Sequence, residues 1–71
     1  MIKEPKLLTF GLNPFQIGGH SISTLAYWIN NEIIFETRIL DDDGEAFIEH
    51  SSEDAAKEWH LSYILNTLSE N

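Results

Sequence analysis

Residues 20–50 decide the fold, and their sequence is HSISTLAYWINNEIIFETRILDDDGEAFIEH. Two segments of this stretch, His20–Ile29 and Glu32–Leu40, are rich in β-branched and aromatic residues, and only Asn30 and Asn31 separate them. That composition is typical of strands, and Asn tolerates the positive φ angles that a two-residue hairpin turn requires. The stretch therefore predicts an antiparallel hairpin. In its register one face, which we expect to lie on the core, carries Ile22, Ala26, Trp28, Ile33, Phe35 and Ile39.

A second hairpin is predicted at Asp43–Gly44, because Asp-Gly is another common two-residue turn signal. This turn places Arg38 opposite Glu49, so that a cation meets an acid across the two strands. A longer turn over Asp41–Gly44 keeps the same faces but pairs Glu36 with Glu49. Like charges directly opposite each other are unfavourable, so we expect the first register.

The residues after this hairpin, Ser-Ser-Glu-Asp at positions 51–54, predict the start of a helix. Ser51 as the cap, with Asp54 three residues later, is a variant of the capping box. We expect the helix to run from about Ser52 to Leu68. Its apolar residues span well over half of the circumference, whereas a helix on one sheet needs a stripe only ~100° wide. These residues are Ala55, Ala56, Trp59, Leu61, Tyr63, Ile64, Leu65 and Leu68.

Together these elements predict a single α+β domain over residues 1–71. We expect an antiparallel three- to four-stranded β-meander over residues 20–50, with a C-terminal α-helix, residues 51–69, packed on one face. Residues 1–19 form an N-terminal segment, in which Leu7–Leu12 is a short strand. A chain of 71 residues with 42% hydrophobic residues has the size and composition of one small folded domain.

One helix covers only one face of such a sheet, and the opposite face is also partly apolar. It carries Leu25, Tyr27, Ile34, Leu40 and Phe47 among polar residues. Either residues 1–19 cover this face or another chain does, because a large exposed apolar patch usually marks an interaction site. The surplus apolar surface of the helix offers a homodimer interface formed by Leu61, Ile64, Leu65 and Leu68.

Charge is the strongest signal in the composition. Twelve Asp and Glu residues face four Lys and Arg residues, which gives a net charge of −8. Seven of these acids lie between positions 41 and 54, where there is no Lys or Arg: Asp41, Asp42, Asp43, Glu45, Glu49, Glu53 and Asp54. Direct binding to nucleic acid or to an anionic membrane is disfavoured, because both need basic residues. The charge predicts a protein partner with a basic surface, such as a nucleic-acid-handling protein; acids that merely keep the protein soluble are the alternative.

Several classes of protein are excluded or disfavoured. The absence of Cys excludes disulfides, zinc–thiolate sites and thiol nucleophiles. Apolar runs such as Ile33–Phe35 are far shorter than the roughly 20 residues of a membrane span. The N-terminus contains no apolar stretch of a secretory signal, so we expect a cytoplasmic protein.

No catalytic or metal-binding motif is complete. Aligning Gly44 with the glycine of an EF-hand loop puts Ile39 and His50 where ligands belong, so that motif fails. A cluster of His50 with the acids at the helix start remains a weak metal candidate; His20 and His60 lack the spacing of ligands. No Ser lies in a nucleophile elbow. We therefore expect no enzyme activity, no metal and no cofactor.

The stretch Glu32–Leu65, a hairpin followed by Ser-Ser-Glu-Asp-Ala-Ala and a helix, is similar to the strand–strand–helix half of small HicB-type antitoxin domains. The similarity covers about half of the chain and rests on turn and capping residues, and the glycine-rich segment expected in that family is absent. It implies an antitoxin-like regulator. In size, acidity and architecture the chain also resembles phage-encoded inhibitors such as anti-CRISPR proteins, without a shared motif.

The sequence thus predicts a small acidic protein-binding module, an inhibitor or regulator of a basic target. The seven acids would steer association and exclude nucleic acid, and Tyr27, Trp59 and Tyr63 would supply the anchoring contacts. The alternative is a homodimeric structural module or an antitoxin-like regulator without inhibitory activity.

Overall fold

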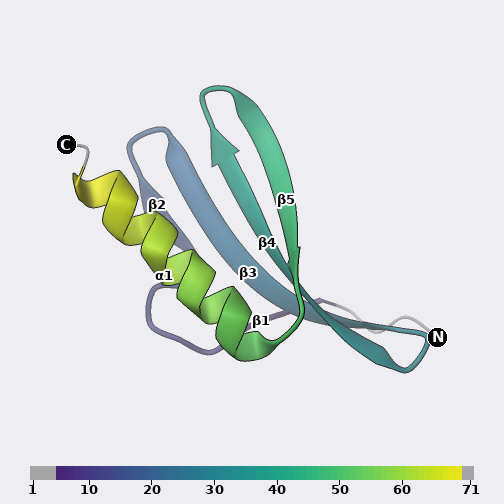
Figure 1. Ribbon diagram of the computed structural model, residues 1–71. Helices are drawn as coiled ribbons and strands as arrows, with labels where there is room; N and C mark the ends of the chain where they lie inside the picture. The colour runs from purple at the N-terminus through teal and green to yellow at the C-terminus, as the bar shows by residue number, and fades with distance from the viewer. Residues whose placement is uncertain (1–4, 70–71) are drawn as a thin grey trace.

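The computed structural model describes residues 5–69, which form one sheet and one helix (Figure 1). Their order is β1 (Lys6–Leu7), β2 (Phe15–Ile17), β3 (His20–Ile29), β4 (Glu32–Asp41), β5 (Gly44–His50) and α1 (Glu53–Ser69). β3 and β4 lie in the middle of the antiparallel sheet, β5 lies at one edge, and β1 and β2 both pair with the other side of β3. The predicted α+β fold with a helix on one face is confirmed, with five strands in place of three or four.

The hairpin of β3 and β4 has the predicted register. Its turn residues, Asn30 and Asn31, have φ angles of 51° and 69°. Trp28 lies opposite Ile33, as expected. Asn adopts such positive φ angles more readily than most residues, and two of them in succession match the twist of the flanking strands.

The turn predicted at Asp43–Gly44 is wrong by one residue. The two turn residues are Asp42 and Asp43, and Asp41 pairs with Gly44. The side chain of Asp41 fixes this turn, because its Oδ1 accepts a hydrogen bond of 2.8 Å from the backbone N–H of Asp43. Gly44 then takes a φ of 119°, a conformation that glycine adopts without steric cost.

This turn imposes the register that the sequence disfavours, with Glu36 opposite Glu49 and Arg38 opposite Phe47. The like-charge pair is tolerated because Glu36 is hydrogen-bonded on both carboxylate oxygens. Tyr27 Oη donates to Oε2 at 3.1 Å, and Arg38 Nε donates to Oε1 at 2.9 Å. The cation expected beside Glu49 therefore neutralises Glu36 instead.

α1 begins one residue later than its predicted cap implies. The backbone N–H of Ala55 donates to Ser52 Oγ at 3.1 Å, and that of Ala56 donates to the Ser52 carbonyl at the same distance. Ser52, rather than Ser51, is therefore the N-cap. Ser51 directly follows His50, the last residue of β5.

The core lies between α1 and the sheet, in two clusters of buried apolar residues. One contains Leu8, Phe35 and Ala56, and the other contains Ile22, Ile39 and Ile64. Two residues predicted in the core, Trp28 and Ile33, are 39% and 44% exposed. The reason is geometric, because the tip of the β3–β4 hairpin extends past the start of α1 (Figure 1).

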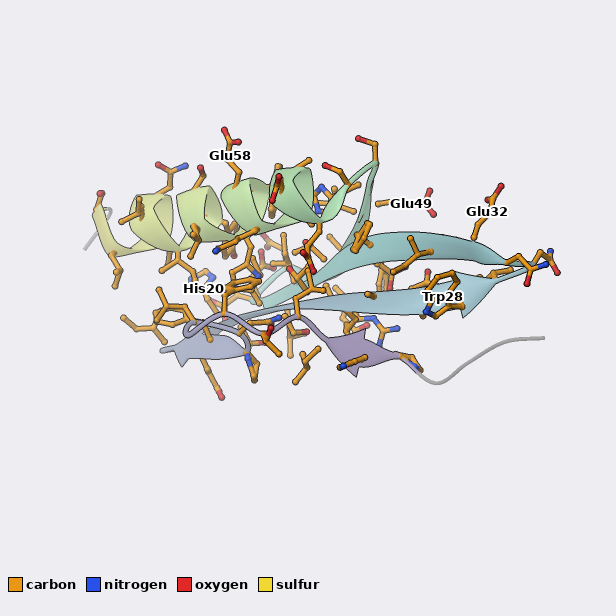
Figure 2. All side chains as sticks on the ribbon, turned by 90° about the horizontal axis from the view of Figure 1, so that it is seen from below. His20, Trp28, Glu32, Glu49 and Glu58 are labelled. Carbon is orange, nitrogen blue, oxygen red and sulfur yellow. The ribbon has the colours of Figure 1, made fainter. Side chains whose placement is uncertain are left out.

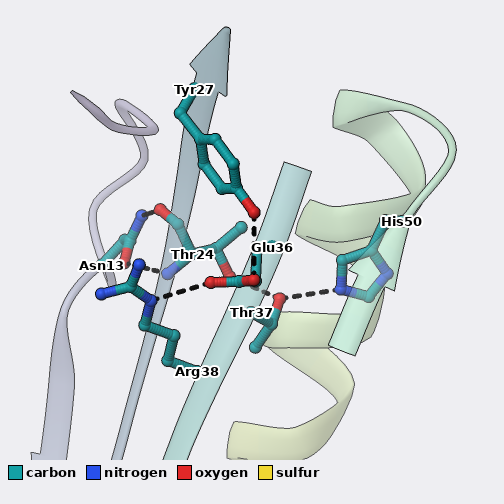
Figure 3. Close-up of polar contacts among 7 residues, drawn as sticks. All are labelled: Asn13, Thr24, Tyr27, Glu36, Thr37, Arg38 and His50. Atoms are coloured by element: carbon teal, nitrogen blue, oxygen red, sulfur yellow. Dashed lines mark hydrogen bonds and ion pairs between the residues drawn. The ribbon is translucent and has the colours of Figure 1, made fainter. Parts of the chain in front are cut away.

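The N-terminal segment widens the sheet along β3. Its strands are shorter than the predicted Leu7–Leu12, and the gap between β1 and β2 is filled by a side chain. The Asn13 amide accepts a hydrogen bond from the Thr24 backbone N–H at 2.9 Å and donates to the Thr24 carbonyl at 2.7 Å. Asn13 thus takes the place of a strand residue beside Thr24 (Figure 3), as the unpaired backbone groups of a buried strand require.

Candidate protein-binding surface

The side of the sheet opposite α1, which we term the open face, is not covered by any element that the structure describes. β1 and β2 pair edge-on with β3, and α1 lies on the other side. The most exposed apolar side chains of the open face are Leu40 at 48% and Phe47 at 57%. By the register, its residues on β3, β4 and β5 are Ser21, Ser23, Leu25, Tyr27, Ile29, Glu32, Ile34, Glu36, Arg38, Leu40, Glu45, Phe47 and Glu49.

A hydrogen-bonded group of side chains organises the centre of the open face (Figure 3). Glu36 receives the Tyr27 hydroxyl and the Arg38 Nε, and the Arg38 guanidinium lies 5.8 Å from the centroid of the Phe47 ring. Burial raises the pKa of Tyr27, and the hydrogen bond to Glu36 and the charges of Glu36 and Glu49 add to this effect. Tyr27 is therefore a neutral donor at physiological pH.

The electrostatic character of the open face is acidic. Arg38 is its one basic residue in the list above, and its charge is matched by Glu36. Glu45 and Glu49 are exposed on either side of Phe47, and within residues 5–69 neither forms an ion pair with a cation. A shallow hollow of ≈ 240 Å³ lies between β3, β4 and β5, and it is lined by Ser21, Ser23, Arg38, Ile39, Leu40, Glu45 and Phe47.

The seven predicted partner-binding acids do not form one patch. The group Asp41, Asp42, Asp43 and Glu45 lies at the turn between β4 and β5, and the group Glu49, Glu53 and Asp54 lies near the start of α1. Glu45 and Glu49 both belong to β5, and the length of this strand, roughly 20 Å, separates the acids of the turn from those of the helix start. Six of these acids are exposed, and Asp41 is half-buried at the turn that it stabilises.

The predicted aromatic anchors lie on opposite sides of the sheet. Tyr27 belongs to the open face, whereas Trp59 and Tyr63 pack from α1 onto the core cluster around Ile22. Their rings stack on each other with centroids 5.8 Å apart. Trp59 and Tyr63 are thus half-buried packing residues, on the other side of the sheet from Tyr27.

The apolar side chains that the open face exposes most are Leu40 and Phe47. The sequence places both on this face without singling them out as contacts. The signal that could have found them is the alternation of Glu45, Phe47 and Glu49, because alternate residues of a strand share one face.

The predicted dimer face on α1 is only partly at the surface. Ile64 is 2% exposed and belongs to the core, so its side chain is not available to a second chain. Leu61 is half-buried, and Leu65 and Leu68 are 64% and 45% exposed. What remains is a narrow pair of exposed leucines in the last turns of α1.

A chain of hydrogen bonds through the core explains two of the three histidines. His60 Nδ1 lies 2.7 Å from Thr24 Oγ1, which lies 2.8 Å from Thr37 Oγ1, which in turn lies 2.8 Å from His50 Nε2. Thr24, Thr37 and His60 are fully buried. His60 is thus a hydrogen-bonded core residue.

Burial lowers the pKa of both His50 and His60. For His60 a hydrogen bond to the carbonyl of Leu12 opposes this effect without cancelling it. The predicted cluster of His50 with the helix-start acids is not formed: His50 Nε2 is bound to Thr37 and its ring lies against Trp59, with centroids 5.9 Å apart. Within residues 5–69 no group of three or more His, Asp or Glu side chains is close enough to hold a metal ion.

No protein-family model, no curated protein and no solved structure matches this chain. The one helix within residues 5–69 is neither long nor apolar enough to cross a membrane.

Proposed function

We propose that this protein is a binding module whose open face docks on a basic surface of a partner protein, and that it acts there as an inhibitor or regulator. The observation that carries the proposal is the combination of exposed Phe47 and Leu40 with unneutralised Glu45 and Glu49 on a face that no described element covers. Apolar groups would supply the desolvated contacts, and the acids would select a basic partner.

Basic surfaces of this kind are typical of nucleic-acid-handling proteins, because they neutralise phosphates. A net charge of −8 would speed association with such a surface and repel the nucleic acid itself. The acids at the turn between β4 and β5 border the open face and extend the same field, whereas Glu53 and Asp54 lie at the far end of β5.

The test is affinity capture from a lysate of the source cells with the wild-type protein, with Phe47→Ser and with Leu65→Ser. Both variants replace an exposed apolar residue, but only Phe47 lies on the open face. We expect a basic protein that wild type and Leu65→Ser retain at low salt, that Phe47→Ser loses, and that added DNA displaces. Equal retention by Phe47→Ser would refute docking through the open face.

A further inference from the structure

The outer edge of the sheet at β5 is free within the described chain. β5 pairs with β4 alone, and α1 lies over the face of the sheet rather than along this edge (Figure 1). The opposite side of β3, by contrast, is taken by β1, β2 and the Asn13 amide. A free strand edge presents a row of backbone donors and acceptors that a further strand can pair with.

The register fixes which residues of β5 face outward with their backbone. A two-residue turn joins a hydrogen-bonded pair, here Asp41 and Gly44. Because hydrogen-bonded and non-hydrogen-bonded pairs alternate in an antiparallel ladder, Glu45, Phe47 and Glu49 occupy the non-hydrogen-bonded positions. Their N–H and C=O groups therefore point to the free edge, and their side chains lie on the open face.

The side chains of this edge disfavour a second copy of the same strand. An antiparallel pair centred on Phe47 sets Glu45 of one copy opposite Glu49 of the other, and a parallel pair sets like residues side by side. Each arrangement opposes acids that no described cation neutralises, which destabilises cross-strand pairs. The edge is thus protected against self-pairing but complementary to a strand of opposite charge.

We propose that β5 accepts an extended segment of the partner as an added antiparallel strand, with Lys or Arg opposite Glu45 and Glu49 and an apolar residue opposite Phe47. The inference rests on the proposed function and specifies its partner. Backbone hydrogen bonds to an added strand supply affinity, and alternate side chains supply specificity. The partner sequence it requires is basic–x–apolar–x–basic, in which the intervening residues point to the side of α1.

The experiment uses the full chain labelled with ¹⁵N and a short synthetic peptide that alternates Thr with Lys, Val and Lys. One control peptide replaces both Lys with Glu, and a second keeps both Lys but carries N-methyl groups on the amides that would bond to β5. We expect the first peptide alone to bind, and to slow hydrogen exchange at the amides of Glu45, Phe47 and Glu49. The amides of Ala46 and Ile48 already face β4, so the peptide should not slow their exchange further.

A matched pair of variants tests the charge. Glu49→Gln should weaken binding of the Lys peptide about two- to fivefold, whereas Glu58→Gln should not, because Glu58 points away from the sheet on the outer side of α1 (Figure 2). Glu49→Gln also removes a like-charge neighbour of Glu36, so loss of folding cannot explain a weaker complex.

The outcomes distinguish strand addition at β5 from docking through the open face without an added strand. If the N-methylated peptide binds as well as the parent peptide, or if no β5 amide gains protection, strand addition is refuted while open-face docking can still pass its own test with Phe47→Ser. If Phe47→Ser captures the partner as well as wild type does, open-face docking fails, whatever the peptides show.

Discussion

The hydrogen bonds through Thr24 and Thr37 can run in only one direction while His60 is neutral. The carbonyl of Leu12 accepts a bond from His60 Nε2 at 2.8 Å, so this nitrogen carries the proton and Nδ1 is an acceptor. Thr24 must then donate to His60, Thr37 to Thr24, and His50 Nε2 to Thr37. Each buried polar group is satisfied only if its neighbour is, which makes the chain sensitive to the loss of any member.

Replacing His60 by leucine should therefore destabilise the domain. The substitution puts an apolar side chain of similar size in the same place, but it removes the donor to the Leu12 carbonyl and the acceptor of the Thr24 hydroxyl proton. We expect a loss of about 1–3 kcal/mol in the free energy of unfolding, measured by urea denaturation. Glu58→Gln on the exposed side of α1 is the control. Equal stability of the two variants would mean that the hydrogen-bonded chain contributes nothing.

The histidines also predict how stability depends on pH. Burial holds the pKa of His50 and His60 below the value of 6.5 that both have when unfolded, so the unfolded chain binds protons first. The free energy of unfolding should be constant with pH above about 6.5 and should fall as the pH decreases through the folded pKa values. Urea denaturation at several pH values checks this. In His60→Leu the decrease should be smaller, and an unchanged decrease would assign it to other groups.

At the scale of elements, the β4–β5 hairpin depends on one glycine. Gly44 has a φ of 119°, and a Cβ added there would meet no atom within 4 Å, so Gly44→Ala strains only the backbone. We expect a loss of about 1–3 kcal/mol in thermal or urea unfolding. Gly11→Ala is the matched control, because its Cβ also meets nothing within 4 Å and its φ is not positive. If both substitutions have the same effect, the turn does not depend on this backbone conformation.

The elements that local residues determine could be predicted from the sequence. Asn30 and Asn31 set one turn, and the Ser-Ser-Glu-Asp stretch at positions 51–54 begins α1, although the cap is Ser52 rather than the predicted Ser51. The register of β4 and β5 could not be predicted, because the hydrogen bond that Asp41 accepts in the turn and the two bonds that Glu36 accepts outweigh the repulsion between Glu36 and Glu49. The bond from Tyr27 to Glu36 exists only once β3 and β4 are paired.

The way in which the N-terminal segment pairs with β3 could not be predicted from the sequence for a related reason. Asn13 replaces a strand residue by its side chain alone, and no periodic pattern marks such a position. The buried pair Thr24 and Thr37 was equally hidden, since Thr on a strand gives no sign of the partners that bury it, and here the partner is His60, 36 residues away from Thr24.

At the scale of the whole molecule, apolar residues lie on both sides of the sheet, in the core under α1 and on the open face. The acids gather at the two ends of β5. The sequence predicts an excess of apolar surface, but it cannot decide which arc of a wide apolar helix packs on the sheet. α1 packs through Ala56, His60 and Ile64, and this choice draws Trp59 and Tyr63 inward and leaves Leu65 and Leu68 outside. Most of the large apolar side chains that stay exposed therefore lie on the sheet and the N-terminal segment.

The net charge and the exposed leucines make opposing predictions about self-association. A measurement of mass therefore distinguishes a module that binds a basic partner from a homodimeric structural module. Two copies that each carry −8 repel one another at low salt, and β5 edges bring acids together. We therefore expect a mass of 8.1 kDa in sedimentation equilibrium at low salt, unchanged by Leu65→Ser combined with Leu68→Ser. Twice this mass, reduced to 8.1 kDa by the two substitutions, would instead establish a homodimer paired through α1. In that case the acidic open face would be the outward surface of a symmetric assembly, and its partner would meet two copies of β5 at once.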